Sequence, residues 1–466
     1  MKVRYIRWSV LFFAFFTVFT VEAQERHELS IQQAVEYARK NSVPVKNALI
    51  GIQLQKQQNR EITAAAFPQI NGNMGANYNP NVTVQQFPNF IAAATYGVLE
   101  SEGVKNGSGG NIVSPSDFGL IAAAFGTKFN ANYGVSLDQL LFDGQVFVGL
   151  MARKTSIDYA TKNVEVTEEN IKANIYKIYY QLSAGKEQLR ILDANIALLT
   201  RLRDDNQKMF ENGFAEKLDV NRASVQLANV ETQRTKALNT IQNGYLGLKL
   251  LMGMPIKDSV ILTDSVTYEN IKDGVLENTA YNYADRKEYQ LADLGKKLRE
   301  FDIRRYKLTK APTVSLSSNY SRISQSNKFN FFGGANWFPS SSIGLKISIP
   351  IFDGFARSAR IEQARLRLQQ TQNDIENLKL TIDKDVNQGL NDYRTALETL
   401  DNQKRNIDLA QLVYNQSKLK YEQGLGSTLE ITSAQNDLQV AQSNYILSLY
   451  DAINAKVDFL KATGKL

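Results

Sequence analysis

The sequence contains no cysteine and a single histidine, and both facts limit the chemistry available to the protein. Without cysteine there are no disulfides, so stability in an oxidising compartment must come from packing or oligomerisation. With His27 alone, neither a histidine-based catalytic site nor a zinc cluster is expected. We find no nucleophile–base set, metal-ligand cluster or phosphate-binding loop, so we predict no enzymatic activity, no metal and no cofactor.

Strong charge imbalance and long apolar runs are also missing. Lys and Arg number 54 against 47 Asp and Glu, with no dense basic block, so we expect no nucleic-acid partner. After the N-terminal region, no run of about 18 apolar residues occurs, so no transmembrane helix is predicted. If the protein crosses a membrane, it must therefore do so as a β-barrel.

The N-terminal region is typical of a secretory signal peptide. Basic residues Lys2, Arg4 and Arg7 precede an apolar run over 8–21, and a small-residue cleavage site ends at Ala23. An uncleaved membrane anchor is the alternative, but a run of about 14 residues is short for a bilayer span. We therefore predict a signal peptide over 1–23 and a secreted mature chain.

The mature chain contains two copies of one pattern. Phe142-Asp143-Gly144 recurs as Phe352-Asp353-Gly354, and the glycines at 213 and 424 open similar motifs. A register held over so many residues indicates a duplication. We predict a first repeat over 24–253, a short polar connector over 254–273 and a second repeat over 274–466. The Phe-Asp-Gly motifs themselves are interpreted as structural, because Gly ends a strand and Asp can cap a helix.

Each repeat is predicted to contain a long helical hairpin, over 144–253 and over 354–464. No proline lies between Pro115 and Pro255 or after Pro350, and apolar residues recur in sevens along the first helix of each hairpin. Such lengths exceed those of globular helices and favour a ring of coiled coils that forms a hollow wall. Shorter helices are expected over about 29–66 and 274–310, the first with a capping box at Ser30 and Gln33.

Four segments alternate between apolar and polar residues, as membrane β-strands do: about 68–80, 128–142, 312–323 and 342–352. A soluble sheet with one buried face shows the same alternation. Aromatic residues near the strand ends favour the membrane interpretation. Four strands are too few to close a barrel, so we expect two or three copies to assemble.

These motifs, in this order and duplicated, resemble the TolC family of outer-membrane efflux proteins. The resemblance includes the opening over 29–34, the segment over 349–354 and the segment over 251–255. It implies a mainly helical, trimeric protein with a 12-stranded barrel in the outer membrane and a 12-helix tunnel in the periplasm. It further implies docking to a periplasmic adaptor and an inner-membrane pump. The fold class is thus mainly α with membrane β, built from a duplicated helix-strand-strand-helix unit.

In that family the hairpin tips close the periplasmic entrance, which maps the tips to 211–220 and 422–431. The candidate gate residues are Asp219, Glu430 and Tyr421. Rings of acids could filter ions, but an acid in the first turn also suits the helix dipole, and a heptad position assigns Tyr421 to packing. Gly426 stands where a basic partner is expected. The candidate adaptor-docking residues are Gly213, Phe214, Ala215, Gly424, Leu425 and Gly426.

Residues 79–127 form a long insert between the first two strands, with apolar patches over 91–99 and 118–125. In the barrel interpretation it lies outside the cell. From its apolar content we expect it to fold over the exit or to pack against neighbouring protomers. The leading functional prediction is a passive outer-membrane conduit for efflux or type I secretion, and the alternative is a secreted coiled-coil scaffold or adhesin without a pore.

Overall fold

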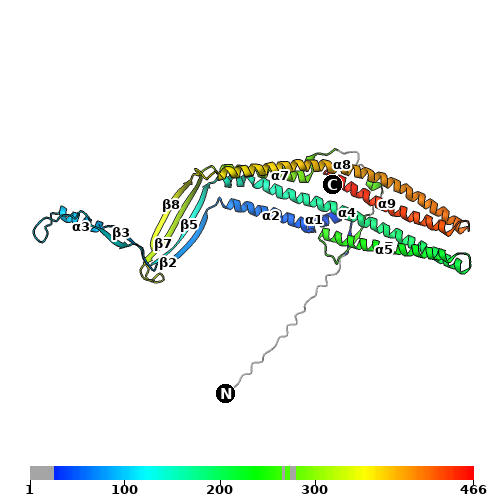
Figure 1. Ribbon diagram of the computed structural model, residues 1–466, viewed down its shortest axis with the longest axis horizontal. Coiled ribbons are helices and arrows are strands. Elements are labelled where there is room, and N and C mark those ends of the chain that lie inside the picture. The colour runs from blue at the N-terminus through cyan, green and yellow to red at the C-terminus, as the bar shows by residue number, and fades with distance from the viewer. Residues whose placement is uncertain (1–25, 265–267, 273–279) are drawn as a thin grey trace, which may run out of the picture. The chain divides into compact units, whose positions relative to one another are not determined.

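A computed structural model describes residues 26–264, 268–272 and 280–466, so the predicted signal peptide and part of the predicted connector lie outside the described residues (Figure 1). The chain divides into two compact units. Unit 1 holds residues up to 54, 157–296 and 371–466, and unit 2 holds 55–156 and 297–370.

Two helical hairpins dominate unit 1. The first consists of α4 (Gly144–Glu211) and α5 (Lys217–Met252), the second of α8 (Ala356–Glu422) and α9 (Thr428–Ala462). Residues 144–156 of α4 and 356–370 of α8 belong to unit 2. All four lie within the ranges expected from the heptads and from the scarcity of proline. Hairpin packing buries Leu199, Leu400 and Tyr393 completely, as expected when apolar residues recur every seven positions.

The shorter helices are interrupted where continuous helices were expected. The helix predicted over 29–66 is present but divided: β1 (Arg26–Leu29) comes first, followed by α1 (Ile31–Asn41), which has the predicted capping box, and α2 (Val43–Ala64). The break falls at Ser42, just before Pro44, which is tolerated only in the first turn of a helix. The helix predicted from 274 is α7 (Lys287–Leu308), preceded by the 3-10 turn η2 (Tyr283–Asp285), while 273–279 lie outside the described residues.

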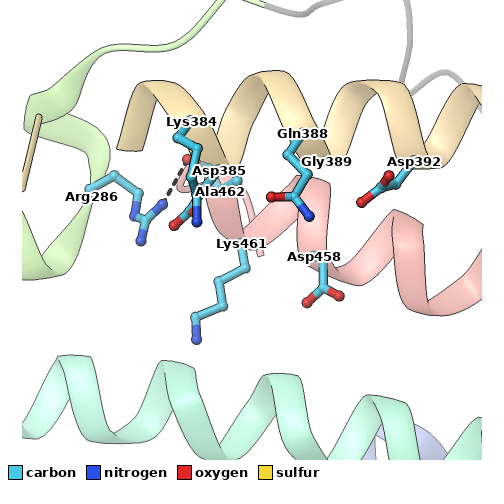
Figure 2. Close-up of a pocket in the computed structure, with 9 residues that line it drawn as sticks. All are labelled: Arg286, Lys384, Asp385, Gln388, Gly389, Asp392, Asp458, Lys461 and Ala462. Atoms are coloured by element: carbon cyan, nitrogen blue, oxygen red, sulfur yellow. Dashed lines mark hydrogen bonds and ion pairs between the residues drawn. The ribbon is translucent and has the colours of Figure 1, made fainter. Parts of the chain in front are cut away.

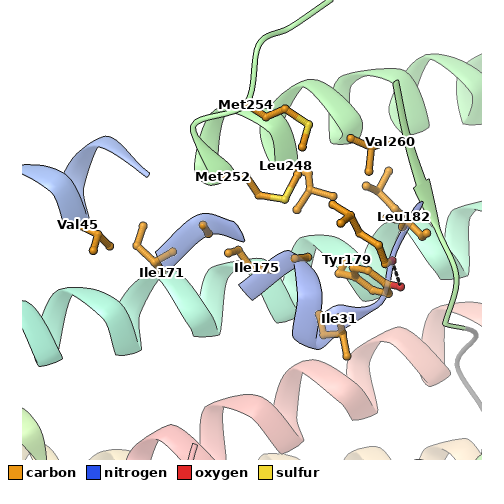
Figure 3. Close-up of a cluster of buried hydrophobic side chains, with 14 residues drawn as sticks. Ile31, Val45, Ile171, Ile175, Tyr179, Leu182, Leu248, Met252, Met254 and Val260 are labelled. Carbon is orange, nitrogen blue, oxygen red and sulfur yellow. Dashed lines mark hydrogen bonds between the residues drawn. The ribbon is translucent and has the colours of Figure 1, made fainter. Parts of the chain in front are cut away.

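The connector is more ordered and more apolar than its sequence suggested. It contains β6 (Ser259–Leu262), which pairs in parallel with β1, and α6 (Tyr268–Lys272). Val260 and Leu262 are buried in one cluster with residues of β1, α1, α4 and α5 (Figure 3). The expectation of a merely polar connector is therefore corrected.

Tyr179 of α4 fastens both strands to the long helix. Its hydroxyl donates a 2.9 Å hydrogen bond to the Leu29 carbonyl (Figure 3) and accepts one of 3.0 Å from the Asp264 amide. The Asp264 carboxylate in turn accepts a 2.8 Å bond from the Ile31 amide at the start of α1. The buried ring thus joins three segments that are far apart in the sequence.

Unit 2 is built on a four-stranded antiparallel sheet in the order β2-β5-β7-β8, with β2 and β8 at its edges (Figure 1). The strands are β2 (Gln69–Tyr78), β5 (Phe129–Phe142), β7 (Thr313–Ser326) and β8 (Phe338–Ser348). They overlap the four alternating segments, although β8 begins earlier than expected and ends at Ser348. Pro339 lies within β8, which is an edge strand and therefore tolerates a residue without an N–H group. Among the described helices, none is both long and apolar enough to cross a membrane.

The insert carries secondary structure of its own. It contains β3 (Val84–Pro88), α3 (Phe90–Ser101) and β4 (Leu120–Ala124), and β3 and β4 form a separate antiparallel pair. The Asn89 side chain caps α3 by accepting a 3.0 Å bond from the Ala92 amide. The segment is therefore a small folded module and not a simple loop.

Candidate functional site

Both hairpin tips turn on a glycine in the left-handed region. The φ angle is 79° at Gly213 and 71° at Gly424, where a side chain would be strained. The next residue of each turn closes it with a backbone bond, from the Phe214 amide at 2.8 Å and from the Leu425 amide at 2.9 Å. These two apolar side chains are left 80% and 79% exposed.

The last turn residues differ between the tips. The first tip has Ala215, whereas the second has Gly426, where an added Cβ would lie 3.1 Å from the Tyr421 amide nitrogen. That contact is with backbone, so a side chain at 426 would push the turn away from α8. Gly426, found in place of the expected basic residue, thus allows the turn to lie close to the backbone of α8.

Tyr421 lies between the two hairpins. Its hydroxyl donates a 2.8 Å hydrogen bond to Oδ1 of Asn206 on α4. Burial raises the pKa of the Tyr421 phenol, and the carboxylates of Asp205 and Asp219 raise it further. The ring packs against a cluster of buried residues from α4, α5, α8 and α9. The structure therefore brings Tyr421 and Asp219 into electrostatic contact and gives Tyr421 both a packing and a hydrogen-bonding role.

Glu430 is held within its own hairpin. Its carboxylate lies 3.2 Å from Nζ of Lys420, and its amide donates a 3.2 Å bond to the Ser427 hydroxyl, which caps α9. Sequence reasoning missed Lys420 and Asn206, because it looked for the basic partner after the turn and not before it. The ten-residue separation of Lys420 and Glu430 across a glycine turn was the available signal.

Buried amides connect the helices deeper in the two hairpins. Gln435 donates a 2.9 Å bond to Asn195, and Asn195 donates one of 3.2 Å to Gln442. Gln439 donates a 2.8 Å bond to Gln233. Polar pairs of this kind at a coiled-coil seam fix the register at a cost in stability. The heptad pattern did not reveal them.

The sheet of unit 2 has one apolar and one polar face. Pairing places Ile70, Met74, Val135, Tyr320 and Ile343 on one side, and the asparagines and serines between them on the other. On the apolar side Met74 is 88% and Ile343 is 80% exposed. A single chain therefore leaves an apolar surface uncovered.

Aromatic side chains gather at both ends of this sheet. At one end Tyr78 packs on Phe129 at 4.8 Å, and Trp337 packs on Tyr133 at 4.9 Å between ring centroids. At the other end Phe142 packs on Phe147 and Phe352 on Phe355. Two aromatic rows that flank an apolar band are typical of sheets that cross an outer membrane.

A pocket of about 340 Å³ in unit 1 is lined by charged side chains of α8 and α9 (Figure 2). Arg286 donates a 2.9 Å bond to the Ala462 carbonyl, and Lys177 pairs with Asp458 at 2.6 Å. These contacts hold the C-terminal end of α9 against α4 and against the segment that precedes α7. Over 26–264, 268–272 and 280–466 no group of three His, Cys, Asp or Glu side chains could hold a metal. His27 lies 3.7 Å from Asp258 on the neighbouring loop.

The long hairpins of unit 1 and the sheet of unit 2 together form a fold that is known from solved structures. A solved structure of CusC, whose description refers to folding and transmembrane channel formation, has the same fold. It aligns with a TM-score of 0.72 at 16% identity over 93% of this chain and 91% of CusC.

Part of the chain matches a known protein family in sequence. Residues 302–465 match the family model described as outer membrane efflux protein. Protein CyaE of Bordetella pertussis is 25% identical over 71% of this chain and 70% of its own length. Outer membrane protein TolC of Vibrio cholerae is 19% identical over 72% and 76%. The resemblance to the TolC family is confirmed: the chain is similar in sequence and in fold to outer-membrane efflux channels.

Proposed function

We propose that the protein is the outer-membrane channel of a tripartite efflux or type I secretion system. It is a passive conduit that receives cargo from a periplasmic adaptor and an inner-membrane pump and releases it outside the cell. The observation that carries the proposal is the four-stranded sheet with two open edges and an exposed apolar face. Unpaired edge groups in lipid cost several kcal/mol each, so the sheet requires a partner at each edge.

Assembly into a homotrimer meets that requirement. Edge strands β2 and β8 run in opposite directions, so β8 of one copy can pair with β2 of the next in an antiparallel ladder. Three copies of the four-stranded sheet give a barrel of twelve strands. The ten residues of β2, at about 3.4 Å each and tilted about 40°, cross about 25 Å, which is the height of an outer-membrane apolar band.

The edge pairing can be tested with engineered thiols, since the chain has no cysteine. We would combine Asn73→Cys on β2 in turn with Ser340→Cys, Ser342→Cys and Gly344→Cys on β8. Outer-membrane fractions should contain heat-sensitive trimers, and one register should give disulfide-linked ladders. Asn132→Cys on the inner strand β5, combined with the same set, is the matched control and should give none. A soluble chain without inter-copy linkage would favour the scaffold or adhesin instead.

The hairpin tips are proposed as the periplasmic entrance and the docking surface. Exposed Phe214 and Leu425 offer apolar contacts. Beside them Gly213 and Gly424 are exposed, and Ala215 and Gly426 are half-buried. A photo-cross-linker on Ala215→Cys should capture a periplasmic adaptor in cells, whereas the same probe on Thr232→Cys, exposed on α5, should not. Phe214→Asp together with Leu425→Asp should reduce capture. Capture of neighbouring protomers alone, with the adaptor present, would contradict the docking proposal.

Asp219, Glu430 and Tyr421 are proposed to form the entrance constriction. Three-fold symmetry turns each acid into a ring, and rings of carboxylates favour cations. In planar bilayers Asp219→Asn with Glu430→Gln should therefore lower cation selectivity, with conductance kept or increased. Unchanged selectivity would leave these acids with only their role at the helix N-termini.

A further inference from the structure

The insert over 79–127 leaves apolar side chains uncovered although it is folded. On one side of α3, Tyr96 packs against Phe118 at 5.5 Å between ring centroids. On the other side Phe90, Ile91 and Val98 are all more than half exposed. A helix that is apolar on both sides is normally buried. The rest of the insert does not provide that cover.

The paired strands β3 and β4 also leave apolar side chains exposed on one face. Phe87 and Phe125 pack together on one face at 5.0 Å. The register places Val84 and Leu120 on the opposite face, where both are exposed. A two-stranded sheet on its own is marginally stable in water. Both elements of the insert therefore need an apolar partner.

The charge pattern indicates what kind of partner this is. Residues 79–99 and 118–127 contain no Asp, Glu, Lys or Arg, and the charged residues of the insert lie between them. Two copies of β3, β4 and the part of α3 that precedes Glu100 can therefore meet without bringing like charges together. Helices that lie on membranes usually carry Lys or Arg on their polar face, which α3 lacks. A second copy of this chain fits better than a lipid surface.

The position of the insert in the chain would bring the inserts of neighbouring protomers close to one another. It connects Tyr78 to Phe129, the paired residues at the end of β2 and β5. In the proposed trimer three inserts would be tethered to the same rim, which raises their effective concentration toward one another. The aromatic row at that end of the sheet marks the boundary of the apolar band. Beyond it the uncovered side chains face water and gain from mutual burial.

We propose that the inserts of neighbouring protomers pack on one another through α3 and the β3–β4 pair and form a cap of three modules at the exit of the channel. This inference rests on the proposed trimeric channel. Its contact side chains are Phe90, Ile91 and Val98 of α3 with Val84 and Leu120 of the strand pair.

Single thiols test the cap in the full-length protein. Val98→Cys and Leu120→Cys, treated on intact cells with a short bis-maleimide, should each give covalent dimers, the largest product that one thiol per chain allows. Ser108→Cys, exposed in the polar turn over 106–110, is the matched control and should remain mostly monomeric after heating. Trimers that form normally but show no linkage at 98 or 120 would overturn the cap. Labelling of these thiols by a lipid-dissolved reagent would overturn it in favour of a membrane contact.

A second variant measures what the cap contributes. Deleting residues 84–124 removes the module and leaves β2 and β5 intact, so trimers should form but dissociate at a lower temperature. An unchanged dissociation temperature and unchanged antibiotic passage would overturn the cap. Absence of trimers in the parent protein is a different result, because it would refute the proposed channel itself and the cap with it.

Discussion

The two hairpin tips have the same kind of backbone turn, but different side-chain contacts hold each tip in place. Gly213 and Gly424 are equivalent in the duplication, and both adopt positive φ. At the second tip Tyr421 bonds to α4 and Lys420 pairs with Glu430. The equivalent residues at the first tip are Phe210, which is partly exposed, and Met209. Both copies thus have the same turn, whereas the hydrogen bond of the tyrosine and the ion pair of the lysine occur only at the second tip.

The largest difference should follow from removing the two equivalent aromatic side chains. Tyr421→Ala deletes a ring that packs in a buried cluster and a hydrogen bond to Asn206, so the second tip should lose about 2 kcal/mol of local stability. Phe210→Ala should cost less than about 1 kcal/mol, because its ring is partly exposed. Hydrogen exchange of the amides over 206–225 and 417–436 measures both, and equal effects would remove the asymmetry.

Alkaline pH should loosen the second tip alone. The pKa of Tyr421 is raised above its ordinary 10.0 by burial first. Its neutral form therefore stabilises the folded tip fully below pH 10, and this contribution is lost as the pH rises toward the raised value. A spin label at Gln423→Cys should become mobile as the pH rises above 10, while one at Asn212→Cys should change less.

Tyr421→Phe is the control for this pH effect, since it keeps the ring and removes the titrating group. Mobility at Gln423→Cys should then be insensitive to alkaline pH. A transition that persists in Tyr421→Phe would assign the effect to another group.

Exchanging the helix caps should move stability from one tip to the other. Ser427 caps α9, whereas the equivalent Glu216 makes no side-chain cap on α5. Ser427→Ala should cost about 1 kcal/mol at the start of α9, and Glu216→Ser should stabilise the start of α5 by a similar amount or less. Exchange rates at 217–220 and 428–431 should change in opposite directions, and a change of the same sign would contradict the comparison.

The smallest effect is expected from the ion pair. Lys420→Met removes the contact with Glu430, and Met209→Lys offers Asp219 an equivalent partner. Both side chains of the existing pair are well exposed, so each change should be worth less than about 0.5 kcal/mol and should fade in high salt. A larger effect that is insensitive to salt would show that the pair is buried in the assembled protein.

Local patterns were sufficient to predict much of this molecule. Scarce proline and heptads predicted the long helices, and alternation located the four strands of the unit 2 sheet, because both periods follow from backbone geometry. The pairing of β1 with β6 was not predictable, since it joins segments more than 200 residues apart. Heptads likewise do not say which neighbour a residue meets, which is why the Tyr421–Asn206 bond and the buried amides were missed.

The β1–β6 pair has a consequence for the order of folding during export. A chain that is exported from its N-terminus delivers Arg26–Leu29 long before Ser259–Leu262. Closing so large a loop is slow, and an unpaired strand edge is prone to aggregation while it waits. In a chain exported in this way, the base of the first hairpin is completed only after Ser259–Leu262 have followed. Holding chaperones in the receiving compartment would act most strongly in that interval.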